Sequence, residues 1–185
     1  MHFNQHSELE GIHAPFSPSQ PYWLNYDDEK LVNVYKNKQA ALMGTKLHEW
    51  AKTTIDLGLK QPRSKKTLYA YVNDAIGFNM TTEVCLKYSN YFFGHADAIC
   101  FRNNFLRIHD LKTGITSPHE EQLEIYAALF CLEYRIKPSE IKIELRIYQS
   151  DDVVVWNPEP EYIQSIMDAI VHKDSVLSEM DNGRL

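Results

Sequence analysis

The chain has 185 residues, of which 44% are hydrophobic and 24% are charged, with a formal net charge of −6 at pH 7. These values are ordinary for one globular domain that buries a sizeable core. The sequence has neither the run of about 18 apolar residues that spans a membrane nor an apolar leader segment, so we expect a cytoplasmic protein without a membrane partner.

The chain begins with a proline-containing segment and continues with helical patterns. Residues 1–26 hold three prolines and show little periodicity, so we expect an irregular arm ahead of a single domain over residues 27–185. Apolar residues at steps of three and four predict a long helix over 27–59. Apolar residues four apart predict a short helix over 64–76.

The middle of the chain has the pattern of three strands. Alternating or continuous apolar runs predict strands over 79–88, 91–101 and 105–112. The residues at 102–104 form the only break between the last two runs, which indicates a hairpin.

The last third of the chain returns to a mixture of helix and strand. A helix is expected to start at Pro118, with Ser117 as its N-cap. Strands are expected over 141–148 and 153–156. An amphipathic helix over 159–180 is expected to close the chain.

Two carboxylates and a lysine fall on the expected hairpin. Asp97 lies within an apolar run, where a lone ionised group would be costly to bury, and Asp110 nearly ends the next run. Paired strands bring the two carboxylates close together, where they repel unless a cation lies between them. Lys112 points to the same face as Asp110 because strand side chains alternate. This set predicts a site for metal-assisted hydrolysis with Mg²⁺ or Mn²⁺.

Four motifs follow one another along the chain: the helical segment Gly44–Trp50 with His48, Gly94-x-x-Asp97, Asp110-x-Lys112-Thr113-Gly114, and Gln122-x-x-x-Tyr126. Together they resemble the PD-(D/E)xK nuclease superfamily, and most closely its RecB-like exonuclease branch. The resemblance covers roughly residues 38–150. It implies an α/β fold with a restriction-endonuclease-like core, in which helices flank a mixed central sheet in the order α-β-β-β-α-β.

The resemblance also implies roles for individual residues. The catalytic residues would be Asp97, Asp110 and Lys112. The metal ligands would be His48, Asp97, Asp110 and the backbone carbonyl of Leu111. The substrate-binding residues would be Gln122, Tyr126 and Thr113, with Glu83, Lys65 and Lys66 as additional candidates. We expect Lys112 to orient the attacking water or to stabilise charge in the transition state rather than to act as a neutral base.

The cysteine spacing and the net charge each bear on the nuclease interpretation. Cys85, Cys100 and Cys131 form no Cys-x-x-Cys pair, so we expect three buried thiols without the iron–sulfur cluster that many RecB-like nucleases hold. A net charge of −6 opposes phosphate binding, whereas four cations within Lys60–Lys66 could contact a DNA backbone or simply be solvated.

The implied function is a Mg²⁺- or Mn²⁺-dependent deoxyribonuclease, with an exonuclease that processes DNA ends favoured over an endonuclease. Its partners would be single- or double-stranded DNA ends and a recombination or helicase protein. A phage or mobile-element origin would suit the small size and would place the protein in the host cytoplasm. Two alternatives remain open: a binding module that retains the nuclease fold without catalysis, and a metal-dependent hydrolase that acts on another substrate.

Overall fold

The structure is a computed structural model that describes residues 4–114 and 119–182. The chain divides into two compact units, Met1–Lys46 and Leu47–Leu185. The first unit contains two short 3-10 helices, Ser7–Leu9 and Pro21–Asn25, and the first part of helix α1, Asp28–Asp56. The domain boundary expected at residue 26 stays a prediction.

Within the first unit, the segment before α1 packs on the start of that helix. The side chain of Asp27 caps it by accepting a hydrogen bond from the backbone N–H of Lys30 at 2.8 Å. The ring of Phe16 lies between its neighbours, with its centroid 6.5 Å from that of Trp23 and 6.4 Å from that of Tyr35.

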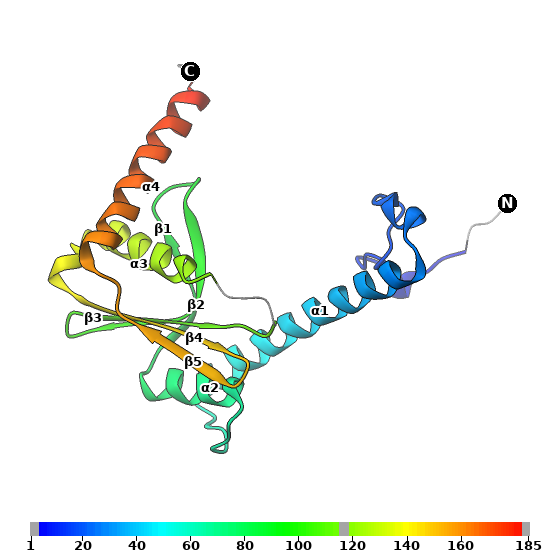
Figure 1. Cartoon of the computed structure of the whole chain (residues 1–185), viewed down its shortest axis with the longest axis horizontal. Coiled ribbons are helices and arrows are strands. Elements are labelled where there is room, and N and C mark those ends of the chain that lie inside the picture. Colours follow the sequence, from blue (N-terminus) through cyan, green and yellow to red (C-terminus); the bar gives the residue numbers. More distant parts are fainter. Residues whose placement is uncertain (1–3, 115–118, 183–185) are drawn as a thin grey trace. The chain divides into compact units, whose positions relative to one another are not determined.

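The second unit is built around a five-stranded sheet in the order β1-β2-β3-β4-β5 (Figure 1). The strands are β1 Thr81–Lys87, β2 Phe93–Arg102, β3 Phe105–Leu111, β4 Lys142–Gln149 and β5 Asp152–Trp156. Strand β3 pairs with β4 in parallel, and every other neighbouring pair is antiparallel. The flanking helices of this unit are α2 Thr67–Gly77, α3 Glu121–Tyr134 and α4 Pro160–Asp181. The chain therefore has an α/β fold with a mixed sheet flanked by helices.

A tight turn joins β2 to β3. Arg102 pairs with Phe105, and the two residues between them, Asn103 and Asn104, have φ angles of 51° and 56°. Two consecutive residues with positive φ are the signature of a type I′ turn, whose twist matches that of paired strands. The expected hairpin is confirmed, and it fixes the register that sets Asp97 beside the end of β3.

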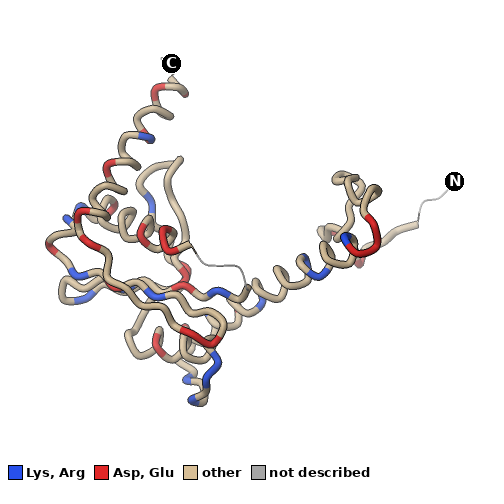
Figure 2. Tube along the Cα trace, viewed as in Figure 1, with Lys and Arg blue, Asp and Glu red and all other residues tan. Residues whose placement is uncertain are grey.

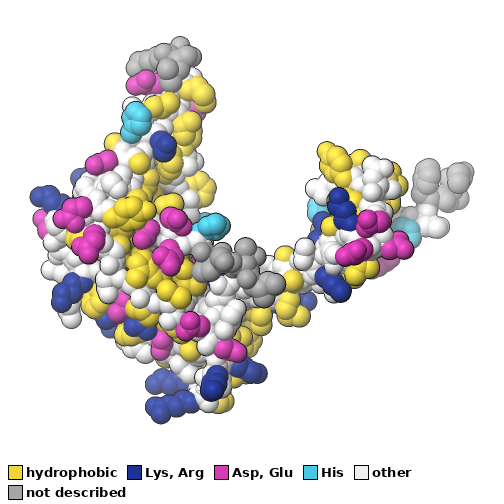
Figure 3. All heavy atoms as spheres, viewed as in Figure 1, with side chains coloured by type: hydrophobic (Ala, Val, Ile, Leu, Met, Phe, Trp, Pro, Cys, Tyr) yellow, Lys and Arg dark blue, Asp and Glu magenta, His cyan; other side chains and the backbone are white. Residues whose placement is uncertain are grey.

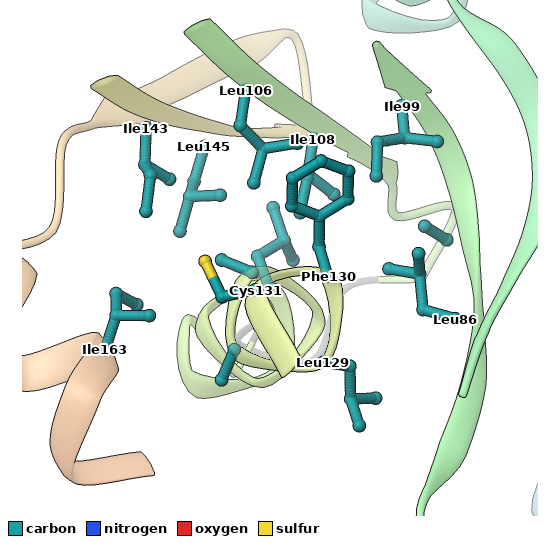
Figure 4. Close-up of a cluster of buried hydrophobic side chains, with 14 of the residues drawn as sticks. Leu86, Ile99, Leu106, Ile108, Leu129, Phe130, Cys131, Ile143, Leu145 and Ile163 are labelled. Carbon is teal, nitrogen blue, oxygen red and sulfur yellow. The ribbon is translucent and has the colours of Figure 1, made fainter. Parts of the chain in front are cut away.

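The two faces of the sheet pack against different helices. On one face, Leu106 and Ile108 of β3 join a cluster with residues of α3 and α4, among them Phe130 and Cys131 (Figure 4). On the other face, Leu111 packs with residues of α2. Because side chains alternate along β3, this division determines which helix each polar residue of the strand meets.

The expected helices and strands are present within the described residues, with bounds that differ by a few positions. Ser117 and Pro118, the expected start of α3, lie outside the described residues. The expectation of three buried thiols was wrong for Cys85, which is exposed, while Cys100 and Cys131 are buried. Cys85 lies on β1, an edge strand that packs only in part against other elements. No helix in the described parts of the chain has the length and apolar character needed to cross a membrane.

Candidate active site

The site begins where the ladder between β2 and β3 ends. The last paired residues are Ala98 and His109, and the next position of the same register sets Asp97 opposite Asp110. The Asp97 side chain accepts a hydrogen bond from the backbone N–H of Leu111, with Oδ2 2.9 Å from the nitrogen. A side-chain contact thus replaces the next rung of the ladder and holds both carboxylates at one end of β3.

Burial and charge both act on Asp97. Its side chain is 18% exposed. Burial, and then the neighbouring charge of Asp110, raise the pKa of Asp97 to about 6, against the opposing effects of the Leu111 N–H and His48. The ionised form of Asp97 is therefore unfavourable near neutral pH, and a bound cation would stabilise it.

Asp110 is more deeply buried and is paired with a lysine. Its side chain is 5% exposed, and the Lys112 ammonium lies 3.0 Å from Oδ2 and donates a hydrogen bond to Oδ1 at 3.0 Å. Apart from this ammonium, Oδ2 has no partner among the residues that the structure describes. A buried carboxylate oxygen with one partner has a further lone pair with which it could bind a metal ion.

Lys112 continues the chain of contacts onto α3. Its ammonium donates to the side-chain oxygen of Gln122 at 2.8 Å, and the Gln122 amide donates to the Tyr126 hydroxyl at 3.3 Å. Gln122 and Tyr126 are four residues apart on one helix face, as the sequence predicts. Asp110, Lys112, Gln122 and Tyr126 therefore form one connected polar row across the end of the sheet.

Gly94 makes room for the last member of this row. A β-carbon placed on Gly94 would lie 2.7 Å from Cε1 of the Tyr126 ring, closer than side-chain carbons approach one another. The close approach of the Tyr126 ring thus favours glycine at the first position of the Gly94-x-x-Asp97 motif. Strand β2 contacts the row at Gly94 and places the Asp97 carboxylate beside it.

His48 and Glu83 approach Asp97 from two other elements. The His48 ring on α1 has its Nδ1 3.5 Å from Oδ2 of Asp97. Glu83 on β1 falls opposite Asp97 in the register, between the pairs Thr82–Ala98 and Val84–Ala96. The φ angle of Glu83 is 51°, a left-handed conformation that costs a non-glycine residue free energy and that is enriched at functional sites.

Three candidates form no hydrogen bond or ion pair with this row within the described part of the chain. Thr113 is exposed beyond the end of β3. Lys65 and Lys66 are exposed on the connection between α1 and α2, where the Lys66 ammonium lies 5.4 Å from the centroid of the Tyr69 ring. Figures 2 and 3 show Lys and Arg gathered on that connection.

Tyr71 is a neighbour of the site that the sequence does not single out. It is 3% exposed on α2, and its pKa is raised by burial and then by the charges of Asp97 and Asp110. Its place among apolar residues of a helix is typical of a core residue, so no local pattern indicates its position beside the carboxylates. His109, in contrast, faces away from the site as its alternation with Asp110 predicts, and its Nδ1 lies 3.3 Å from the Tyr148 hydroxyl.

The donors fit a hard divalent cation in chemistry but are not assembled into a ligand set. Oxygen donors from Asp97, Asp110 and the Leu111 carbonyl suit Mg²⁺ or Mn²⁺, and the imidazole of His48 adds a nitrogen donor 3.5 Å from the Asp97 carboxylate. Within residues 4–114 and 119–182, no three His, Cys, Asp or Glu side chains lie close enough together to hold a metal ion. The neighbouring carboxylates of Asp97 and Asp110 are the part of the expected set that the structure brings together.

Comparisons with known proteins add little to this geometry. No protein-family model matches the sequence, and no curated protein matches it. A solved structure described as the crystal structure of SSO0001 is similar over 82% of this chain and 67% of its own, at 14% identity and a TM-score of 0.36. A likeness at this level carries no argument about function, which has to be inferred from the residues of the site.

Proposed function

We propose that this protein is a metal-dependent DNA nuclease of the RecB-like PD-(D/E)xK type, which hydrolyses phosphodiester bonds with Mg²⁺ or Mn²⁺. The observation that carries the proposal is the pairing of the buried Asp110 with Lys112, beside a second, partly buried carboxylate, Asp97. Two acids and a lysine held at one end of a strand pair are suited to hydrolysis of a phosphate ester.

Each residue of the candidate site has a role in this proposal. Asp97, Asp110 and the Leu111 carbonyl would hold the cation, with His48 as a further ligand. The cation would polarise the phosphate and neutralise its charge. Lys112, fixed between Asp110 and the Gln122 oxygen, would stabilise charge that develops on the phosphate or orient the attacking water. Gln122 and Tyr126 would keep Lys112 in place and contact the substrate.

The decisive experiment incubates the full chain with end-labelled DNA. Linear single-stranded, linear double-stranded and closed circular DNA are each tested with Mg²⁺, Mn²⁺ or EDTA. We expect cleavage of linear DNA with either metal and none in EDTA. Cleavage of circular DNA would identify an endonuclease instead of the exonuclease that we favour. Undiminished cleavage in EDTA would contradict the proposed chemistry.

A pair of matched variants makes this test specific. Asp110→Asn removes a charge from the buried pair, whereas Asp168→Asn makes the same change on the exposed side of α4. Cleavage should be lost in the first variant and retained in the second. Retention of DNA without cleavage by the wild-type protein would favour the alternative of a non-catalytic binding module. If DNA were neither cut nor bound, the result would favour a metal-dependent hydrolase that acts on another substrate.

A further inference from the structure

One cavity of the second unit lies away from the carboxylates. It has a volume of about 700 Å³ and is lined by the β2–β3 turn, the residues that end α2, and the segment that leads into β4. Phe105 at this cavity and Asp110 at the site are five residues apart on β3, which corresponds to about 17 Å along a strand. The two places therefore cannot share one small ligand.

The lining of the cavity is cationic although the chain as a whole is acidic. Its charged members are Arg102, Arg107, Lys142 and Glu140. Three positive charges against one negative leave a local excess of two, in a chain with a net charge of −6. Figure 2 shows Lys and Arg at the β2–β3 turn and at the start of β4, which lie at the same end of the sheet.

Two of these cations have no partner among the residues that the structure describes. Glu140 is 3.7 Å from Lys137, and Arg107 is 3.1 Å from Glu144, so both of these lining residues are already paired. Arg102 and Lys142 form no ion pair and no side-chain hydrogen bond with any residue that the structure describes. Their charges are therefore available to a ligand in the cavity.

The remaining groups add rigidity and further donors. The guanidinium carbon of Arg107 lies 3.8 Å from the ring centroid of Phe105 and 4.5 Å from that of Phe78, so this wall is fixed by cation–π contacts. The type I′ turn presents the side-chain amides of Asn103 and Asn104, neither of which has a hydrogen-bond partner within the described residues. A rigid wall with two free cations and two free amides is suited to an anion with several oxygens.

We propose that this cavity is a binding site for a phosphate group, distinct from the carboxylate site, with Arg102 and Lys142 as its principal ligands. The volume leaves room for more than one phosphate, so a nucleotide or a segment of polynucleotide backbone would fit the same donors. The inference does not depend on the proposed nuclease activity, because none of these residues belongs to the row from Asp110 to Tyr126.

The test is an NMR titration of the ¹⁵N-labelled full chain with inorganic pyrophosphate, in EDTA so that metal-bridged binding at the carboxylates is absent. Saturable shifts should centre on the amides of Asn103, Asn104 and Lys142. Acetate at equal ionic strength should produce no saturable change. Shifts that never saturate, or that centre on the connection between α1 and α2, would overturn the proposal.

Variants decide whether the two free cations are the cause. Arg102→Gln/Lys142→Gln should weaken pyrophosphate binding at least about tenfold, since each removes a charge-assisted hydrogen bond. Lys36→Gln/Lys38→Gln removes the same two charges from the exposed surface of α1 and should leave the affinity unchanged. Equal losses in both variants would show a diffuse effect of net charge and would contradict a defined site.

Two further ligands distinguish the source of the phosphate. Deoxyadenosine monophosphate and a 5′-phosphorylated thymidine hexanucleotide are titrated under the same conditions. If the hexanucleotide binds more tightly, the site holds nucleic-acid backbone, and if the mononucleotide binds equally well, it holds a small phosphorylated molecule. Both results support the phosphate site, whereas the absence of shifts at Asn103 and Asn104 with pyrophosphate and both of these ligands would reject it.

Discussion

The Asp97 carboxylate on β2 accepts a hydrogen bond from the backbone N–H of Leu111 on β3, at 2.9 Å. This contact lies at the point where the strands stop pairing through their backbones, and it holds an ionisable group where burial and Asp110 both oppose its charge. Holding the ionised Asp97 carboxylate in this position lowers the stability of the fold. Such a loss is common at sites that bind cations or polarise substrates.

The first prediction concerns this local loss of stability. The pKa of Asp97 in the folded protein, about 6, lies above its ordinary value of 3.8, so the folded state favours the protonated form. Stability from this group is fully present below the ordinary value and is lost as the pH rises through about 6, by at most about 3 kcal/mol. In EDTA at pH 7.5, Asp97→Asn should therefore raise the midpoint of thermal unfolding.

The same measurement at lower pH supplies the control. Near pH 4 the wild-type Asp97 is protonated in the folded state, so the advantage of Asp97→Asn should disappear. Asp168→Asn on α4 should leave the midpoint unchanged at both pH values. A midpoint for Asp97→Asn below that of the wild-type protein at pH 7.5 would show that the carboxylate stabilises the fold, contrary to the geometry.

The second prediction separates chemistry from binding along the row. Lys112→Ala removes the charge next to Asp110 and should lower the single-turnover rate of cleavage by a factor of about 10²–10³. Gln122→Ala leaves that charge but frees the ammonium from its second partner, so we expect a smaller loss of rate at saturating DNA with little change in affinity. If Gln122→Ala weakened binding and left the rate intact, Gln122 would hold the substrate without positioning Lys112.

The third prediction uses the space that Gly94 leaves for Tyr126. Gly94→Ala places a carbon 2.7 Å from the aromatic ring, and the rigid side chain must move. We expect a loss of about 1–3 kcal/mol in the free energy of unfolding, as for other overpacked positions, together with slower cleavage.

A double-mutant cycle tests whether that loss arises from the ring. Gly94→Ala/Tyr126→Ala removes the clash, so the methyl group at position 94 should cost little in the background of Tyr126→Ala. Urea denaturation of the four proteins measures the coupling. Additive losses would mean that the alanine disturbs the β2 backbone by itself and that the contact with Tyr126 is incidental.

The sequence predicts the local parts of this site better than its long-range contacts. The hairpin, the shared face of Asp110 and Lys112, and the shared face of Gln122 and Tyr126 follow from strand alternation and helical periodicity. Tyr71 could not be found in this way, because its place beside the carboxylates depends on how α2 packs on the sheet. The left-handed conformation of Glu83 is equally hidden, since glutamate carries no local signal for positive φ.

The roles of individual residues are harder to predict from the sequence than the fold, because they too depend on long-range contacts. The strands and helices of the second unit are dictated by patterns of burial, and these patterns are strong in an α/β chain. The cavity beside Arg102 and Lys142 depends on three segments that are distant in sequence, and each of its cations alone resembles an ordinary surface residue. Because these cations are far apart in the sequence and come together only on folding, the cavity could not be predicted from the sequence.

The last prediction concerns the exposed cations between α1 and α2. If Lys60, Arg63, Lys65 and Lys66 follow a DNA backbone, replacing all four with Gln should reduce the slope of log affinity against log salt by about one for each lost phosphate contact. The single-turnover rate at saturating DNA should stay unchanged, because no residue of the row from Asp110 to Tyr126 is altered. Lys36→Gln/Lys38→Gln, on the exposed surface of α1, serves as the control and should preserve the slope. An unchanged slope in the fourfold variant would mean that these cations are only solvated, and the DNA-binding surface would have to lie on other elements.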